Sequence, residues 1–81
     1  MKVSVDISLY PLDKNYEAPI IAFIQKLKSS NFSILETPLS TQVYGDYDAV
    51  VDFLKEAMKE TFVTEEMAVF NMKFIKGDRT L

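Results

Sequence analysis

The chain has 81 residues, 48% of them hydrophobic and 26% charged, which is the balance of one small globular domain spanning residues 1–81. It has no cysteine and no histidine, so disulfides, thiolate or imidazole metal sites and imidazole catalysis are excluded. The net charge of −3, with a single arginine at Arg79, argues against a nucleic-acid partner, because neutralising phosphates takes a clustered basic face. We therefore expect no metal, no cofactor and no nucleic acid.

Nothing in the sequence resembles a membrane span or a signal peptide. No apolar run approaches the roughly 20 residues of a span, and Met1-Lys2 lead directly into an alternating pattern. An anionic membrane surface is disfavoured by the same lack of basic clusters. We expect a cytoplasmic protein without membrane contact, and we expect self-association because a core this small gives only marginal stability.

Residues 3–10 alternate between apolar and polar side chains. Val3, Val5, Ile7 and Leu9 lie on one face, and Ser4, Asp6, Ser8 and Tyr10 lie on the other. This period of two predicts a strand with one buried and one polar face. Pro11 is expected to end the strand, because it lacks a backbone donor.

A helical pattern follows this strand. Apolar residues recur three and four positions apart at Tyr16, Ile20, Phe23, Ile24 and Leu27. Asp13 and Asn15 offer capping oxygens, and Pro19 fits only a first turn, so the helix is expected to begin at residues 14–17. The cluster of polar residues at 29–31 is expected to close it.

Two short strands are predicted at residues 32–36 and 39–44, joined as a hairpin through Thr37-Pro38. Gly45-Asp46 is expected to stop the second strand, and Asp46 to cap a second helix. The apolar stripe of that helix is Val50, Val51, Leu54, Ala57, Met58 and Phe62. A last strand is predicted at residues 67–75, with Ala68, Phe70, Met72 and Phe74 on its buried face, and a frayed polar tail at 76–81.

This order of elements predicts an α+β fold, the ferredoxin-like βαββαβ two-layer sandwich, with an antiparallel four-stranded sheet and two helices on one face. Right-handed crossovers place the first and third strands at the centre. The other face of the sheet then lacks a cover. It carries Ser4, Asp6, Ser8, Tyr10, Asn71 and Lys73, a mixture that suggests a partner subunit or a ligand.

Enzyme signatures are missing from the chain. A Gly-rich phosphate loop is excluded because Gly45 and Gly77 are the only glycines. Asp46 and Asp48 suit helix capping better than metal binding. Small acylphosphatases share the predicted topology but need an arginine in a phosphate loop, whereas Arg79 lies near the C-terminus. We therefore expect a protein that is not an enzyme.

Binding groups are concentrated in residues 37–42. Thr37, Ser40, Thr41 and Gln42 supply donors and acceptors, and Tyr10, Tyr16 and Tyr44 supply aromatic faces. This mixture suits a small planar heterocycle, and Asp6 would favour a cationic one. The alternative is that Ser40 and Thr41 are ordinary strand residues and the tyrosines are subunit contacts.

Three segments resemble the thiamine-binding, YkoF-like family: VSVDISLYPL at residues 3–12, TPLST at 37–41 and GDYDAV at 45–50. The resemblance implies ferredoxin-like units that bind thiamine or its hydroxymethylpyrimidine portion and assemble through their sheets into a homodimer or homotetramer. It also implies that Ser8, Tyr10, Thr37, Ser40 and Thr41 lie at or near the ligand. Gln42 is added to this ligand-binding set from its chemistry and its adjacency.

Two hypotheses follow from these observations. The first is non-catalytic binding of thiamine or a related pyrimidine by an oligomeric cytoplasmic protein that acts as a carrier, buffer or sensor. The alternative is a structural or regulatory oligomerisation module with no small-molecule ligand, whose open sheet face is a subunit interface.

Overall fold

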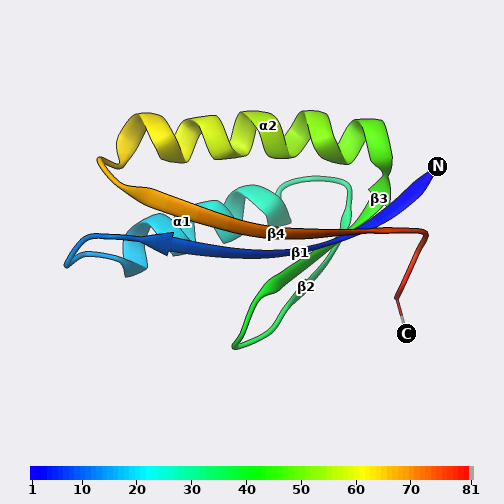
Figure 1. Cartoon of the computed structure of the whole chain (residues 1–81), viewed down its shortest axis with the longest axis horizontal. Coiled ribbons are helices and arrows are strands. Elements are labelled where there is room, and N and C mark those ends of the chain that lie inside the picture. The colour runs from blue at the N-terminus through cyan, green and yellow to red at the C-terminus, as the bar shows by residue number, and fades with distance from the viewer. Residues whose placement is uncertain (81) are drawn as a thin grey trace.

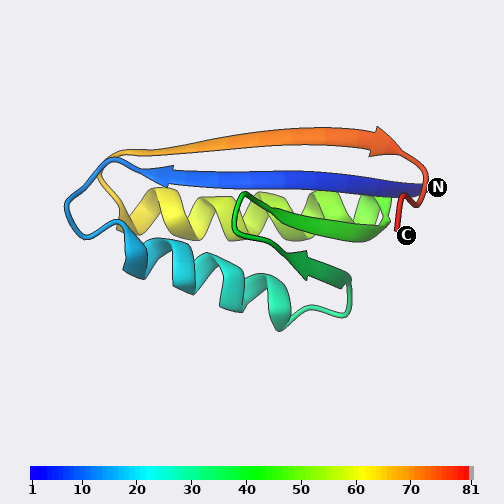
Figure 2. The ribbon, with the colours of Figure 1, turned by 90° about the horizontal axis from the view of Figure 1, so that it is seen from below.

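A computed structural model describes residues 1–80 of the chain. The elements are β1 (Lys2–Pro11), α1 (Glu17–Lys28), β2 (Ser33–Glu36), β3 (Thr41–Asp46), α2 (Tyr47–Thr64) and β4 (Ala68–Lys76). The strands form one antiparallel sheet in the order β2-β3-β1-β4, and both helices pack on one of its faces (Figure 1 and Figure 2). This arrangement confirms the predicted ferredoxin-like sandwich with the first and third strands at its centre.

The hydrophobic core lies between the sheet and the helices. It consists of Val3, Val5, Ile7, Val43, Phe23, Leu27, Val50, Leu54 and Ala57, all of them buried. The predicted buried face of the first strand is confirmed. On α2 the prediction was wrong at one position, because Phe62 is 53% exposed whereas Thr61 is buried, with its hydroxyl donating to the carbonyl of Ala57 at 3.4 Å. Phe74 on β4, also predicted as core, is 47% exposed.

The first strand extends through Pro11, contrary to prediction. The hydrogen bonds Leu12 N–H to Met67 O (3.0 Å) and Gly77 N–H to Lys2 O (2.8 Å) show that even-numbered residues of β1 direct their backbone groups toward β4. Pro11 therefore belongs to the odd-numbered set, which faces the other way. Because no strand lies opposite Pro11 on that side, its missing N–H removes no ladder hydrogen bond.

The helices begin without the predicted side-chain caps. The N-cap of α1 is Tyr16, and Asp13 instead accepts the N–H of Asn15 at 3.4 Å. Asp46 occupies the predicted N-cap of α2 but makes no capping hydrogen bond, and it is still part of β3. Its carboxylate lies 3.5 Å from Lys2 Nζ, an exposed ion pair that contributes little stability.

The C-terminal residues 77–80 are anchored, which corrects the prediction of a frayed tail at those positions; Leu81 lies outside the described residues. Ser4 Oγ donates to the carbonyl of Gly77 at 2.8 Å and accepts the N–H of Arg79 at 2.9 Å. Gly77 has a φ of 98°, which glycine adopts without strain. Hydrogen bonds from the N–H and hydroxyl of Thr80 lower the pKa of the Asp78 carboxyl and hold the turn.

Gly45 is closely surrounded where β3 passes under α2. A Cβ atom at this position would lie 2.7 Å from Cδ1 of Phe32 and 3.1 Å from Cγ2 of Val50. Phe32 has little room to retreat, because it packs edge-on against Phe53 with ring centroids 5.6 Å apart. We expect Gly45→Ala to destabilise the protein by about 1–3 kcal/mol through overpacking, measured by urea denaturation. Ser33→Ala on the exposed side of β2 is the control, and equal stability of the two variants would contradict the prediction.

Candidate functional site

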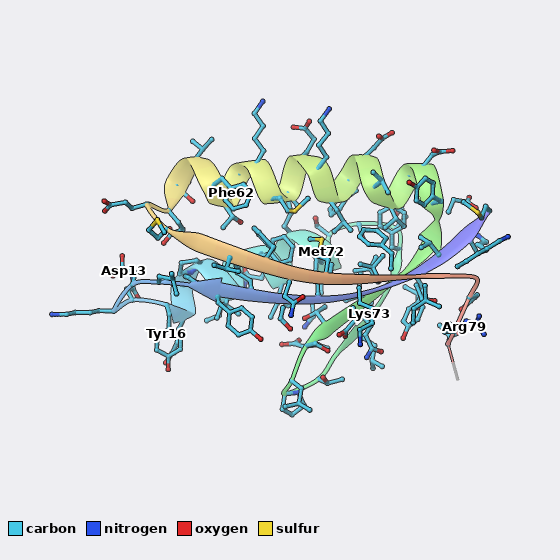
Figure 3. All side chains as sticks on the ribbon, viewed as in Figure 1. Asp13, Tyr16, Phe62, Met72, Lys73 and Arg79 are labelled. Atoms are coloured by element: carbon cyan, nitrogen blue, oxygen red, sulfur yellow. The ribbon has the colours of Figure 1, made fainter. Side chains whose placement is uncertain are left out.

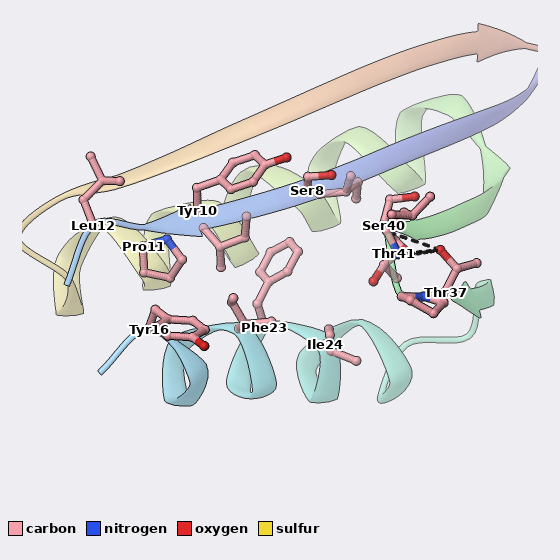
Figure 4. A pocket seen from close by; sticks show the side chains of 15 residues that line it. Ser8, Tyr10, Pro11, Leu12, Tyr16, Phe23, Ile24, Thr37, Ser40 and Thr41 are labelled. Carbon is pink, nitrogen blue, oxygen red and sulfur yellow. Dashed lines mark hydrogen bonds between the residues drawn. The ribbon is translucent and has the colours of Figure 1, made fainter. Parts of the chain in front are cut away.

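A cavity of about 440 Å³ opens between α1, the end of β1 and the turn that joins β2 to β3 (Figure 4). It exists because the strands differ in length. β3 pairs with β1 only from Lys2 to Ile7, so residues 8–11 of β1 extend beyond the end of β3. The cavity therefore replaces the missing continuation of the sheet, and its volume is within the range of small-molecule sites.

The exposed edge of β1 presents unpaired backbone groups to this cavity. Tyr47 N–H donates to Met1 O at 2.8 Å, in register with the β1–β3 ladder, so odd-numbered residues of β1 face β3. Leu9 is the next such residue after Ile7, and no residue of β3 lies opposite it. Its N–H and C=O point side by side toward the cavity that Leu9 lines. These main-chain groups can pair with a ligand edge that carries one donor and one acceptor.

The apolar wall of the cavity comes from α1. Ile20, Phe23 and Ile24 of α1 line it together with the N-cap residue Tyr16, and Figure 4 shows Phe23 rising from the helix toward β1. Sequence reasoning named Tyr16 as an aromatic binding face but assigned Ile20, Phe23 and Ile24 to the apolar stripe alone and missed their second role. Ile20 and Ile24 are only half-buried, because the strand that would cover them is too short. The sequence signal that could have revealed this role was the unequal length of the predicted strands at 3–10 and 39–44, a difference that is larger in the structure.

Thr41 is the most enclosed polar residue of the cavity. Only 6% of it is exposed, and it faces the helix layer because it lies on the same face of β3 as buried Val43. Its hydroxyl makes no hydrogen bond within residues 1–80, yet no fully buried side-chain polar atom of those residues is left without a partner. The hydroxyl therefore has solvent access, and the cavity is the space that Thr41 borders.

Thr37 has a structural role in the turn. Its hydroxyl donates to Ser40 O at 2.9 Å and accepts the N–H groups of Leu39 (3.2 Å) and Ser40 (3.1 Å). These three bonds fill the capacity of a hydroxyl. With the Thr37 N–H bonded to Ser40 O at 2.9 Å, Pro38-Leu39 form a two-residue loop, which confirms the predicted hairpin. Thr37 thus reaches the cavity but offers a ligand no free polar atom.

Ser40 connects the cavity to the open face of the sheet. Ser40 lines the cavity, and its hydroxyl donates to Asp6 Oδ1 at 2.5 Å and retains acceptor capacity. Asp6 is half-buried and lies on the open face with Ser4. The carboxylate of Asp6 thus lies next to Ser40 at the rim of the cavity, while no charged side chain lines the cavity itself.

Five of the six predicted site residues lie around this cavity: Ser8, Tyr10, Thr37, Ser40 and Thr41. Ser8 and the half-exposed Tyr10 border the cavity from β1, but their side chains lie on the face of β1 that points away from α1 (Figure 4), the open face of the sheet. Gln42 does not reach the cavity, because strand alternation turns it to the open face of β3. There its Oε1 accepts the hydroxyl of Tyr44 at 2.6 Å. Adjacency in sequence therefore does not bring Gln42 to this cavity, and a role for it in binding stays a prediction.

Residues 1–80 offer neither a membrane span nor a cluster of metal-binding side chains. No helix in this part of the chain is both long and apolar enough to cross a membrane. Among the same residues, no group of three or more acidic side chains converges in a way that could hold a metal ion.

No family model and no curated protein matches the chain. Several solved structures are similar to the chain. A protein from Streptococcus pneumoniae is 26% identical, with a TM-score of 0.90 over 98% of this chain and 90% of its own. A Thermotoga maritima protein, provisionally assigned to thiamine biosynthesis or salvage, is 22% identical, with a TM-score of 0.87 over 95% of this chain and 85% of its own. A Bacillus cereus domain of unknown function (DUF77) is 18% identical, with a TM-score of 0.81 over 99% and 80%. The chain therefore shares its fold with these proteins over nearly its whole length.

Proposed function

We propose that this protein binds thiamine or a related pyrimidine such as hydroxymethylpyrimidine without catalysing a reaction, as a homodimeric or homotetrameric cytoplasmic carrier, buffer or sensor. The observation that carries the proposal is the paired N–H and C=O of Leu9 in a cavity with apolar walls. A 4-aminopyrimidine ring presents an acceptor nitrogen beside an amino donor, which is the complement of that edge. The provisional thiamine assignment of the Thermotoga maritima protein adds support.

The charge distribution favours a neutral ring inside the cavity and a cation outside it. Burying a charge without a partner is costly, and the lining residues are all uncharged. Asp6, hydrogen-bonded to Ser40 at the rim, offers a carboxylate to a positively charged group beyond it. Thiamine combines a neutral aminopyrimidine with a cationic thiazolium ring, so its two halves suit these two environments.

Replacing Thr41 with valine is expected to weaken binding about 2- to 10-fold, because a net hydrogen bond contributes about 0.5–1.5 kcal/mol. The substitution preserves shape and removes only the hydroxyl. Isothermal titration calorimetry with thiamine and with hydroxymethylpyrimidine measures the change. Gln42→Ala is the matched control, since Gln42 is bonded to Tyr44 on the other face and should leave affinity unchanged. Absence of binding by the folded wild-type protein up to millimolar ligand would refute the proposed function.

The alternative, an oligomerisation module without a ligand, is favoured by apolar exposure on the open sheet face. Tyr10, Leu35, Val69 and Ile75 are 42–51% exposed there. Under this alternative Tyr10→Ala changes the oligomeric mass, while neither wild type nor variant binds the two compounds. Mass and affinity measured on the same preparations separate the two functions.

A further inference from the structure

The cavity beside Leu9 presents no cation to a ligand. Within the described part of the chain, every residue that lines it is apolar or neutral and polar. A phosphate monoester carries about −1.5 to −2 charges near neutral pH. To leave water it needs a cation or several convergent charge-assisted hydrogen bonds. The lining therefore suits a compound without a phosphate group.

The start of α1 also fails to provide an anion site at this cavity. Helix N-termini commonly bind phosphate through their free N–H groups, and Tyr16, the N-cap of α1, lines the cavity. However, Glu17 places a carboxylate in the first turn, where it already interacts with the helix dipole. Pro19, the third residue of the helix, has no N–H to donate. This helix end is therefore a poor place for a second anion.

A carboxylate lies beside the cavity on the open face of the sheet. Ser40, at the rim, donates its hydroxyl to Asp6 Oδ1 at 2.5 Å. Asp6 shares this face with Ser8 and Tyr10, which border the cavity from β1. A substituent that extends from the cavity toward the open face meets this carboxylate, which attracts a cation and repels a phosphate.

The cations of the open face lie beyond this carboxylate. Lys73 is opposite Asp6 in the β1–β4 register, and Figure 3 shows it on the side of the sheet away from α2. Arg79 borders a separate depression of about 190 Å³ that Asp6 and Gln42 also line. Neither cation lines the cavity. Because β1 separates β3 from β4, Asp6 lies between the Ser40 rim and Lys73.

We propose that this site selects the unphosphorylated form of its ligand and excludes the phosphate ester, with Asp6 as the residue that sets the preference. The inference rests on the proposed function and adds a chemical class to it. The bound compound is a neutral heterocycle whose second part is cationic or neutral and keeps its hydroxyl free. The cargo is thus a compound that has not yet undergone phosphoryl transfer.

Calorimetry with thiamine and thiamine monophosphate, which differ only in the phosphate, tests the selectivity. The wild type should bind thiamine about 10-fold or more tightly than the ester. Asp6→Asn keeps an acceptor for the Ser40 hydroxyl and removes the charge, so the ratio of the two affinities should fall about 3-fold or more. Asp52→Asn, on an exposed position of α2, changes the net charge equally and should leave the ratio unchanged.

A second pair of variants separates charge from size. Leu39 lines the cavity next to Ser40 and is 89% exposed, so Leu39→Lys adds a cation at the rim without disturbing the core. Affinity for the ester should rise about 3-fold or more relative to thiamine, whereas Leu39→Gln should leave the ratio as in the wild type. A site that excluded phosphate by its size would gain nothing from the lysine.

The possible failures are distinguishable. Equal affinity of the wild type for thiamine and its monophosphate would overturn this inference and leave the proposed function standing. Ester binding that is tight in the wild type and lost in Lys73→Gln would overturn it too, and so would an unchanged ratio in folded Asp6→Asn. Absence of binding of thiamine and hydroxymethylpyrimidine by the folded wild type would instead refute the proposed function, and this inference with it. Circular dichroism checks the fold of each variant.

Discussion

Replacement of Leu27 with alanine is expected to lower the free energy of unfolding by about 2–5 kcal/mol. Leu27 has no exposed surface and lies in the core between α1 and the sheet, so its removal leaves a cavity that the rigid surroundings fill only in part. At about 0.05–0.15 kcal/mol per residue, a chain of 81 residues has a total stability of about 4–12 kcal/mol. The variant would thus lose a large fraction of that total. If the stability of the wild type lies in roughly the lower half of this range, the variant would fail to fold at 37 °C.

Urea denaturation monitored by circular dichroism measures this change. Leu39→Ala is the matched control, because Leu39 is 89% exposed at the tip of the β2–β3 turn and the same truncation should cost less than about 0.5 kcal/mol. A similar loss in both variants would show that the core is not where the structure places it.

The variant Leu9→Pro is expected to weaken binding of thiamine or hydroxymethylpyrimidine by about 10-fold or more. The lost hydrogen bond contributes about 0.5–1.5 kcal/mol, and the ligand acceptor left buried without a partner costs about 1–3 kcal/mol. The fold should tolerate the proline, because the N–H of Leu9 faces the cavity and not β4. Pro11, two positions further along the same edge, shows that the strand already accommodates one. Calorimetric affinity and thermal unfolding are measured together.

Two neighbouring substitutions make this experiment interpretable. Leu9→Ala removes the same side chain but keeps the N–H, so affinity should stay within a few-fold of the wild type. Tyr10→Pro removes an N–H that faces β4 in the pair with Val69, so it should lower the melting temperature sharply. If Leu9→Pro folds and binds as tightly as Leu9→Ala, the ligand does not use the main chain of β1.

Regular periodicity made the core of this fold predictable. The alternation at residues 3–9 and the helical spacing from Phe23 to Leu27 each have one low-energy solution, which buries the apolar set. The errors came where tertiary contacts outweigh local propensity. Asp46 has the right position and chemistry for a cap, but its carboxylate lies near Lys2 and the first amide of α2 bonds to Met1 O. The carbonyl of Met1, next to β1, thus satisfies one of the free amides at the start of α2, while the Asp46 side chain satisfies none of them.

The candidate site was predictable only in part for a similar reason. Ser8, Tyr10, Ser40 and Thr41 could be named from their chemistry and from the family resemblance, and the structure places all four around one cavity. Leu9 could not be named, because its contribution is a pair of main-chain groups that every residue carries. Whether such groups are free depends on where the neighbouring strand ends, and no local pattern records that.

The sequence by itself determined the order of the elements, the face that each one buries and the absence of histidine and cysteine chemistry. Those properties follow from residue type and period, which act over a few positions. Only the tertiary structure decided that β1 extends past β3 to leave a cavity beside Leu9. It also decided that the hydroxyl of Thr37 is fully hydrogen-bonded within its turn and that β4 lies at the edge of the sheet. These features depend on which backbone groups remain unpaired once all strands are in register, and pairing joins residues far apart in the chain.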